Sequence, residues 1–215
     1  MNERKSKFYT IWLCLACIIV FVIQTIIPSI TEMFMLTPNA LAQPWQFLTA
    51  VFLHGGIAHL LYNLVALLMF GLILEQIIGS RKFIIFYLLA GIFANICSFL
   101  VYPNQSGLGA SGAIMGIIGV VAVLKPTMTI WLYNLPMPMF VGAIIWVGGS
   151  VLGIFGFGDQ SIGYAAHLSG IFIGLIYGFY LRLKYNKKSV KVYQNNKIII
   201  PEDSMRSWED YNMGR

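Results

Sequence analysis

Charged residues are scarce in this sequence, and their scarcity excludes most classes of protein. Asp, Glu, Lys and Arg together make up 10% of the 215 residues, whereas soluble domains carry about 25%. Hydrophobic residues make up 58%, so too few charged side chains remain to cover the surface of a soluble globule. A chain this apolar is not intrinsically disordered either. We therefore expect an integral membrane protein.

Cysteine is also sparse, which excludes a small secreted scaffold held together by disulfides. Cys14 and Cys17 form a Cys-x-x-Cys pair, but the pair lies inside an apolar run. No neighbouring histidine or second cysteine pair completes a zinc or redox site. We interpret both as small packing residues, which is the usual behaviour of free cysteine.

Long apolar runs are what the sequence has instead. They occupy residues 8–29, 58–78, 83–102, 110–124, 128–157 and 162–181. Most approach the length of about 20 residues that a helix needs to cross a bilayer, and all are too long for the strands of a membrane barrel. The fourth run is shorter and would reach only about 22 Å as a helix. We predict an all-α bundle of six transmembrane helices, in which a short fourth helix begins below the outer surface.

The positive charges give this bundle an orientation. All 14 Lys and Arg residues fall in the segments 1–7, 79–82, 125–127 and 182–215. Six crossings would place these segments on one side, and the alternate segments 30–57, 103–109 and 158–161 contain no Lys or Arg. By the positive-inside rule both termini are predicted to be cytoplasmic. The net charge of +6 is then a topology signal and does not require a nucleic-acid partner.

The same reasoning divides the chain into three parts. Residues 1–7 are predicted to be a cytosolic N-terminus, residues 8–183 a six-helix membrane domain, and residues 184–215 a basic and polar cytosolic tail. The first run has no small-x-small cleavage site and is interpreted as a retained helix rather than a signal peptide. The lack of a targeting segment suits the plasma membrane of a prokaryote.

A few polar residues lie within or beside the apolar runs, where they are functional candidates by default. His59 and Asn63 are spaced i, i+4 and share one face of the second helix. Ser111 lies at the start of the short fourth helix, where free backbone N–H groups favour negative charge. His167 lies near the outer end of the sixth helix. A serine needs a base to become a nucleophile, and histidine is the usual one.

Glycine spacing predicts that Ser111 and His167 meet. Small residues spaced four apart let two membrane helices approach closely. Glycines at steps of three or four recur on the fourth and sixth helices, at Gly109, Gly112, Gly116, Gly170, Gly174 and Gly178. No acidic residue is placed to complete a triad, because Glu32 and Asp159 are in loops and Glu75 is at the far end of its helix. We therefore favour a Ser-His dyad over a Ser-His-Asp triad.

At these residues the chain resembles the rhomboid family of intramembrane serine proteases. The resemblance covers about residues 8–183 and rests on three motifs in the family's order. They are His54-x-x-x-x-His59-x-x-x-Asn63, Gly109-Ala110-Ser111-Gly112 and Ala166-His167-x-x-Gly170-x-x-x-Gly174. The resemblance implies the compact six-helix, rhomboid-like form, in which the long first external loop (30–57) braces the bundle from the side.

The resemblance also implies an activity and a role for each residue. The protein would be a serine endopeptidase that cleaves single-span transmembrane proteins in or near the lipid bilayer, without a metal or a cofactor. Ser111 would be the nucleophile and His167 the base, while His59, Asn63 and the Ser111 backbone N–H would form the oxyanion hole. The supporting residues would be His54, Gly109, Gly112, Met115 and Gly170. Met115 stands where some family members carry an aromatic residue that stacks on the histidine, so we expect weaker positioning of His167.

The fifth run adds a hypothesis about substrate access. It is rich in glycine and has Pro136 and Pro138 near its start, and such a helix packs loosely or bends. We predict that it forms a mobile side of the bundle through which a substrate span reaches the site.

Two other functions remain open. A catalytically silent rhomboid-like protein would bind membrane clients without cleaving them, but such proteins usually lack the serine or the histidine. A small transporter or channel is disfavoured because the runs show no inverted repeat and no charged residue near the midplane. The oligomeric state, the substrate and the role of the tail are not predicted.

Overall fold

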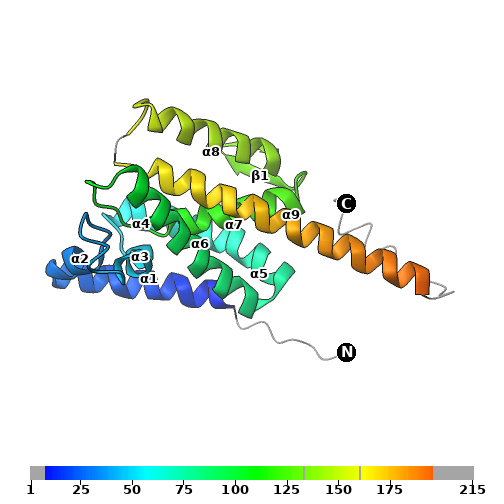
Figure 1. The fold of residues 1–215 in the computed structure, drawn as a ribbon, viewed down its shortest axis with the longest axis horizontal. Coiled ribbons are helices and arrows are strands. Elements are labelled where there is room, and N and C mark those ends of the chain that lie inside the picture. Colours follow the sequence, from blue (N-terminus) through cyan, green and yellow to red (C-terminus); the bar gives the residue numbers. More distant parts are fainter. Residues whose placement is uncertain (1–7, 133, 160, 196–215) are drawn as a thin grey trace.

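The computed structural model describes residues 8–132, 134–159 and 161–195. The predicted cytosolic segment 1–7 and the tail after residue 195 lie outside the described residues. The described chain is predominantly helical, and Figure 1 shows its helices side by side in one bundle. In that view α1 and α8 lie at opposite edges of the bundle, and α6, α7 and α9 lie between them.

Four of the helices are long and apolar enough to cross a membrane. They are α1 (Tyr9–Ile26), the continuous helix Ile57–Ile78, α6 (Ser80–Val101) and the Tyr164–Lys184 part of α9 (Tyr164–Asn195). The helix Ile57–Ile78 consists of α4 (Ile57–Ala66), a π-helical turn η2 (Leu67–Gly71) and α5 (Leu72–Ile78). Two further apolar helices are shorter, α7 (Ser111–Leu124) and α8 (Met139–Ile154).

The start of the fifth apolar run is not helical, which corrects the expectation of an all-α chain. A hairpin precedes α8, with β1 (Thr129–Leu132) antiparallel to β2 (Leu135–Pro138) and Thr129 opposite Pro138. The reason lies in the prolines, because Pro136 and Pro138 lack the N–H that a helix interior needs but are tolerated in an edge strand. Asn134 makes the turn with a left-handed φ of 61°, a conformation that asparagine adopts more readily than most residues.

The last helix is longer than the sixth apolar run. α9 continues to Asn195, so the domain boundary predicted between residues 183 and 184 falls inside a helix. Figure 1 shows the end of α9 projecting beyond the other helices. α9 therefore continues beyond the apolar part into the segment predicted to be the cytosolic tail.

The long first loop is folded rather than extended. It contains α2 (Ser29–Phe34), α3 (Gln46–Thr49) and the 3-10 turn η1 (Ala50–Phe52). The Asn95 side chain on α6 donates a hydrogen bond of 2.9 Å to the carbonyl of Phe47, and the Phe47 ring packs edge-on against Phe99. Leu36 and Gly107 exchange two backbone hydrogen bonds of 2.9 Å each. The loop is thereby fixed to α6 and to the segment that leads into α7.

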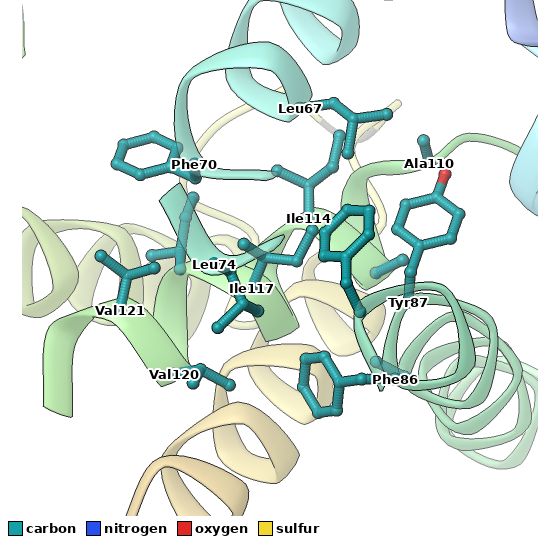
Figure 2. Close-up of a cluster of buried hydrophobic side chains, with 14 of the residues drawn as sticks. Leu67, Phe70, Leu74, Phe86, Tyr87, Ala110, Ile114, Ile117, Val120 and Val121 are labelled. Atoms are coloured by element: carbon teal, nitrogen blue, oxygen red, sulfur yellow. The ribbon is translucent and has the colours of Figure 1, made fainter. Parts of the chain in front are cut away.

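The short helix α7 lies at the centre of the core. From Gly112 to Val123 every residue except Met115 is buried. Figure 2 shows α7 side chains, among them Ile114 and Ile117, gathered with residues of the neighbouring helices such as Leu67, Leu74 and Phe86. Because packed helices surround α7, the backbone of its first residue is held by the whole bundle.

Candidate active site

The structure brings Ser111 and His167 together. Ser111 is the first residue of α7, and His167 lies in the first turn of α9. The Oγ of Ser111 and the Nε2 of His167 are 2.9 Å apart, which is hydrogen-bonding distance. Both residues are half-buried. Within the described residues, no Asp or Glu hydrogen bonds to His167, and no group of three or more His, Cys, Asp or Glu could hold a metal ion.

Glycines place the two helices in backbone contact at this point. A β carbon added to Gly170 would overlap the carbonyl oxygen of Gly112, and one added to Gly174 would overlap that of Gly116. These are the glycines whose spacing predicts a close contact between the two helices. Since backbone atoms are the contacting groups, α7 and α9 cannot approach more closely at these positions.

His59 approaches the serine from α4. A β carbon on Gly109 would lie 2.9 Å from the His59 Nε2 and 3.9 Å from the Ser111 Oγ, so the imidazole edge faces Gly109 beside the serine. Gly109 also has a φ of 128°, which favours glycine. The other ring nitrogen, Nδ1, accepts a hydrogen bond of 3.4 Å from the Gly55 N–H. In a neutral ring this leaves Nε2 as the protonated donor.

Asn63 lies one turn beyond His59 and is buried. Its side-chain Nδ2 donates a hydrogen bond of 2.8 Å to the carbonyl of His59, within the same helix. The structure therefore does not join Asn63 to Ser111 by a hydrogen bond. An amide nitrogen carries two N–H bonds, and this hydrogen bond uses one of them.

His54 precedes α4, and its ring is 2% exposed. The His54 and His59 rings meet edge to face, with their centroids 5.3 Å apart. Burial, together with the neighbouring His59, lowers the pKa of His54 to about 4. This histidine is therefore neutral at physiological pH and supports the ring of His59 by packing.

Gln24 is a residue that the sequence analysis did not single out. Its side-chain Oε1 accepts a hydrogen bond of 3.1 Å from the His54 N–H, and its Nε2 donates one of 3.3 Å to the His54 carbonyl. The Nε2 also donates to the Thr31 Oγ1 at 3.0 Å. A buried glutamine inside an apolar run is a signal that could have drawn attention to it.

Tyr164 is a second residue that the sequence analysis missed. Its ring meets the His167 ring at 84°, with the centroids 6.5 Å apart. Met115, the residue expected to replace a stacking aromatic, is half-buried and packs against the hydrophobic core. The aromatic neighbour of His167 thus comes from its own helix. The spacing i, i+3 between Tyr164 and His167 was the available signal.

Comparison with known proteins gives one family. The Rhomboid domain family matches residues 41–184, more than half of the chain. The chain is 38% identical over 131 residues to the rhomboid protease GluP of Bacillus subtilis, covering 60% of this chain and 24% of that protein. It is 30% identical over 155 residues to the mitochondrial RHOMBOID-like protein 6 of Arabidopsis thaliana, covering 66% of this chain and 45% of that protein.

A third relative agrees with these two. The Rhomboid-like protease 3 of Toxoplasma gondii is 37% identical over 119 residues, which cover 51% of this chain and 45% of the relative. The chain thus spans less than half the length of each of these three relatives. The apolar helices and the domain match together identify a membrane protein, and the chain belongs to the rhomboid family.

Proposed function

We propose that this protein is an intramembrane serine endopeptidase that cleaves single-span transmembrane proteins in or near the bilayer. The observation that carries the proposal is the 2.9 Å hydrogen bond between Ser111 and His167. Two of the relatives named above are called rhomboid proteases, which supports the same reaction class.

The dyad supplies the two proton transfers that peptide hydrolysis needs. His167 Nε2 takes the proton from Ser111 Oγ as the oxygen attacks the scissile carbonyl carbon. The tetrahedral intermediate collapses, His167 returns the proton to the leaving amine, and an acyl-serine ester remains. A water molecule, deprotonated by the same nitrogen, then hydrolyses the ester and restores Ser111.

Three donors would stabilise the oxyanion of each tetrahedral intermediate. The Ser111 backbone N–H is at a helix N-terminus, where it has no intrahelical acceptor. His59 offers its Nε2–H beside Gly109, and Asn63 offers the N–H that its own helix does not use. Donors fixed before the reaction cost no reorganisation when the charge develops.

The membrane topology is the second part of the proposal. The protein would lie in the cell membrane of a prokaryote and cross it six times, with the four long helices, α7 and α8. Six crossings would leave both termini in the cytoplasm. The placement of all 14 Lys and Arg residues supports this orientation. It puts Ser111, His167 and His59 in the outer half of the bundle, below the membrane surface.

The helix α8 is the proposed side for substrate access. β carbons added to Gly148 and Gly156 would meet nothing within 4 Å. Phe140, Ile144 and Leu152 of the same helix are exposed apolar residues. A transmembrane substrate would meet this apolar surface from the lipid before it reached the dyad.

Labelling with a fluorophosphonate probe tests the activity without knowledge of the substrate. The purified protein in liposomes should form a covalent adduct at Ser111, and Ser111→Ala should form none. A wild-type protein that is folded but not labelled would favour the alternative, a catalytically silent protein that binds membrane clients. Proteomic comparison of released ectodomains, wild type against Ser111→Ala, would then identify the substrates.

A further inference from the structure

The Tyr164 side chain packs against two glycines, Gly153 and Gly158, in space that a larger residue at either position would fill. Gly153 lies in the last turn of α8, and Gly158 lies in the segment that joins α8 to α9. A β carbon on Gly153 would overlap the ring of Tyr164, and one on Gly158 would approach the Tyr164 hydroxyl oxygen. Gly158 has a φ of 127°, so its backbone also favours glycine. The tyrosine ring therefore packs against the end of α8, and we call this contact with Gly153 and Gly158 the seat of Tyr164.

The same ring contacts the base. Tyr164 and His167 are one helical turn apart on α9, and their rings meet edge to face. His167 makes its described hydrogen bond through Nε2 alone, and no described carboxylate holds its other nitrogen. A rotation of the imidazole about its Cβ–Cγ bond would break the bond to Ser111. In the described part of the chain, rotation of the His167 imidazole is therefore opposed by the side chains that pack against the ring.

We propose that Tyr164 is a positioning residue, which holds the His167 imidazole toward Ser111 and is itself held by the end of α8. This inference rests on the proposed protease function and adds a residue to it. It also gives Gly153 a specific role, because a methyl group there would push the tyrosine ring away from its seat. The position of α8 is thereby linked to the orientation of the base.

The test compares four variants by their rate of fluorophosphonate labelling in liposomes. Tyr164→Phe keeps the ring and should be labelled at the wild-type rate. Tyr164→Ala should be labelled about 2- to 10-fold more slowly, the range expected for one aromatic pair. Gly153→Ala should slow labelling by a similar factor. Gly149→Ala, four residues earlier on the same helix and facing open space, is the matched control and should be unaffected.

A double variant separates positioning from a general structural effect. If Gly153 acts through Tyr164, then Tyr164→Ala combined with Gly153→Ala should be no slower than the slower single variant. Effects that multiply would overturn the inference, as would wild-type labelling of Tyr164→Ala or equal slowing in Tyr164→Phe. Melting temperatures of all variants identify any loss of fold. A wild-type protein that is not labelled at all would instead refute the protease function itself.

Discussion

Ser111 Oγ and His167 Nε2 lie 2.9 Å apart at a point where their two helices are in backbone contact. The hydrogen bond therefore does not depend on a flexible approach of two long side chains. It joins residues 56 positions apart in the sequence, and each stands in the first turn of its helix. The proposed chemistry requires this contact, and the first prediction removes it.

Loss of either dyad member should abolish turnover while the protein stays folded. Ser111→Ala removes the nucleophile and His167→Ala removes the base, so neither variant should cleave a transmembrane substrate or react with a fluorophosphonate. Cleavage assays in liposomes, with thermal melting as the control for folding, check both variants. Residual cleavage by Ser111→Ala at a rate near that of the wild type would refute the assignment of the nucleophile.

Asn63→Ala should reduce kcat without a comparable change in KM. The side chain is proposed to donate to the oxyanion, which exists only after the attack, and loss of one such donor costs about 10²- to 10³-fold in rate. Steady-state kinetics with a cleaved reporter substrate measure the two constants separately. An increase in KM alone would show that Asn63 binds the substrate and does not stabilise the transition state.

Gln24→Ala should destabilise the protein. The substitution leaves the buried N–H and carbonyl of His54 without their side-chain partner, and a buried unsatisfied polar group costs about 1–3 kcal/mol. Thr25→Ala is the matched control, because Thr25 is exposed and its hydroxyl bonds only to Val22 of its own helix. Equal melting temperatures for the two variants would contradict the role given to Gln24.

His54 should make the stability depend on pH. Its pKa of about 4 in the folded protein lies below the usual histidine value of about 6.5. The unfolded chain therefore binds more protons between these values, and the folded state loses stability as the pH falls from about 6.5 toward 4. Between pH 7 and pH 5 the loss should reach about 2 kcal/mol. His54→Asn should reduce this loss, and melting curves of both proteins across the pH range measure it.

Glu75 should be needed for stability but not for catalysis. Its buried carboxylate accepts hydrogen bonds from the Tyr9 N–H, the Thr10 N–H and the Thr10 hydroxyl, at 2.8, 2.9 and 2.7 Å. Glu75→Gln turns one acceptor into a donor that faces these donors, at a cost of about 1–3 kcal/mol. Along the helix axis Glu75 is about 24 Å from His59, so the labelling rate per folded molecule should not change. If fully folded Glu75→Gln protein were labelled more slowly than the wild type, the prediction would be wrong, and Glu75 would influence the site at Ser111.

Much of the helical fold follows from the lengths of the apolar runs and from the spacing of glycines. The short α7 begins at Ser111, the residue with which the sequence analysis associates a helix start, and the glycines predicted to let α7 and α9 approach are in contact. Such features depend on local composition and on spacing within one helix. They can be read without knowledge of how the helices are arranged.

The features that the sequence analysis missed arise from contacts between distant segments. Gln24 acts on His54, 30 residues away, and nothing local to α1 indicates that partner. The seat of Tyr164 depends on Gly153 at the end of another helix. The hairpin before α8 was hidden because strands and helices of similar apolar content look alike over a few residues. The rotamer of Asn63, which bonds to its own helix, is likewise not encoded in a motif.

The backbone contact between α7 and α9 has a consequence for protein engineering. Because main-chain atoms meet at Gly112 and Gly170, we expect side-chain replacements elsewhere in the bundle to change little in the distance between the proposed nucleophile and the proposed base. The first loop and α8 are the elements proposed to brace the bundle and to meet the substrate. If the proposed function holds, we expect that they can be redesigned for new sequence preferences while Ser111 and His167 keep their alignment, provided that the contact of Tyr164 with Gly153 is left intact.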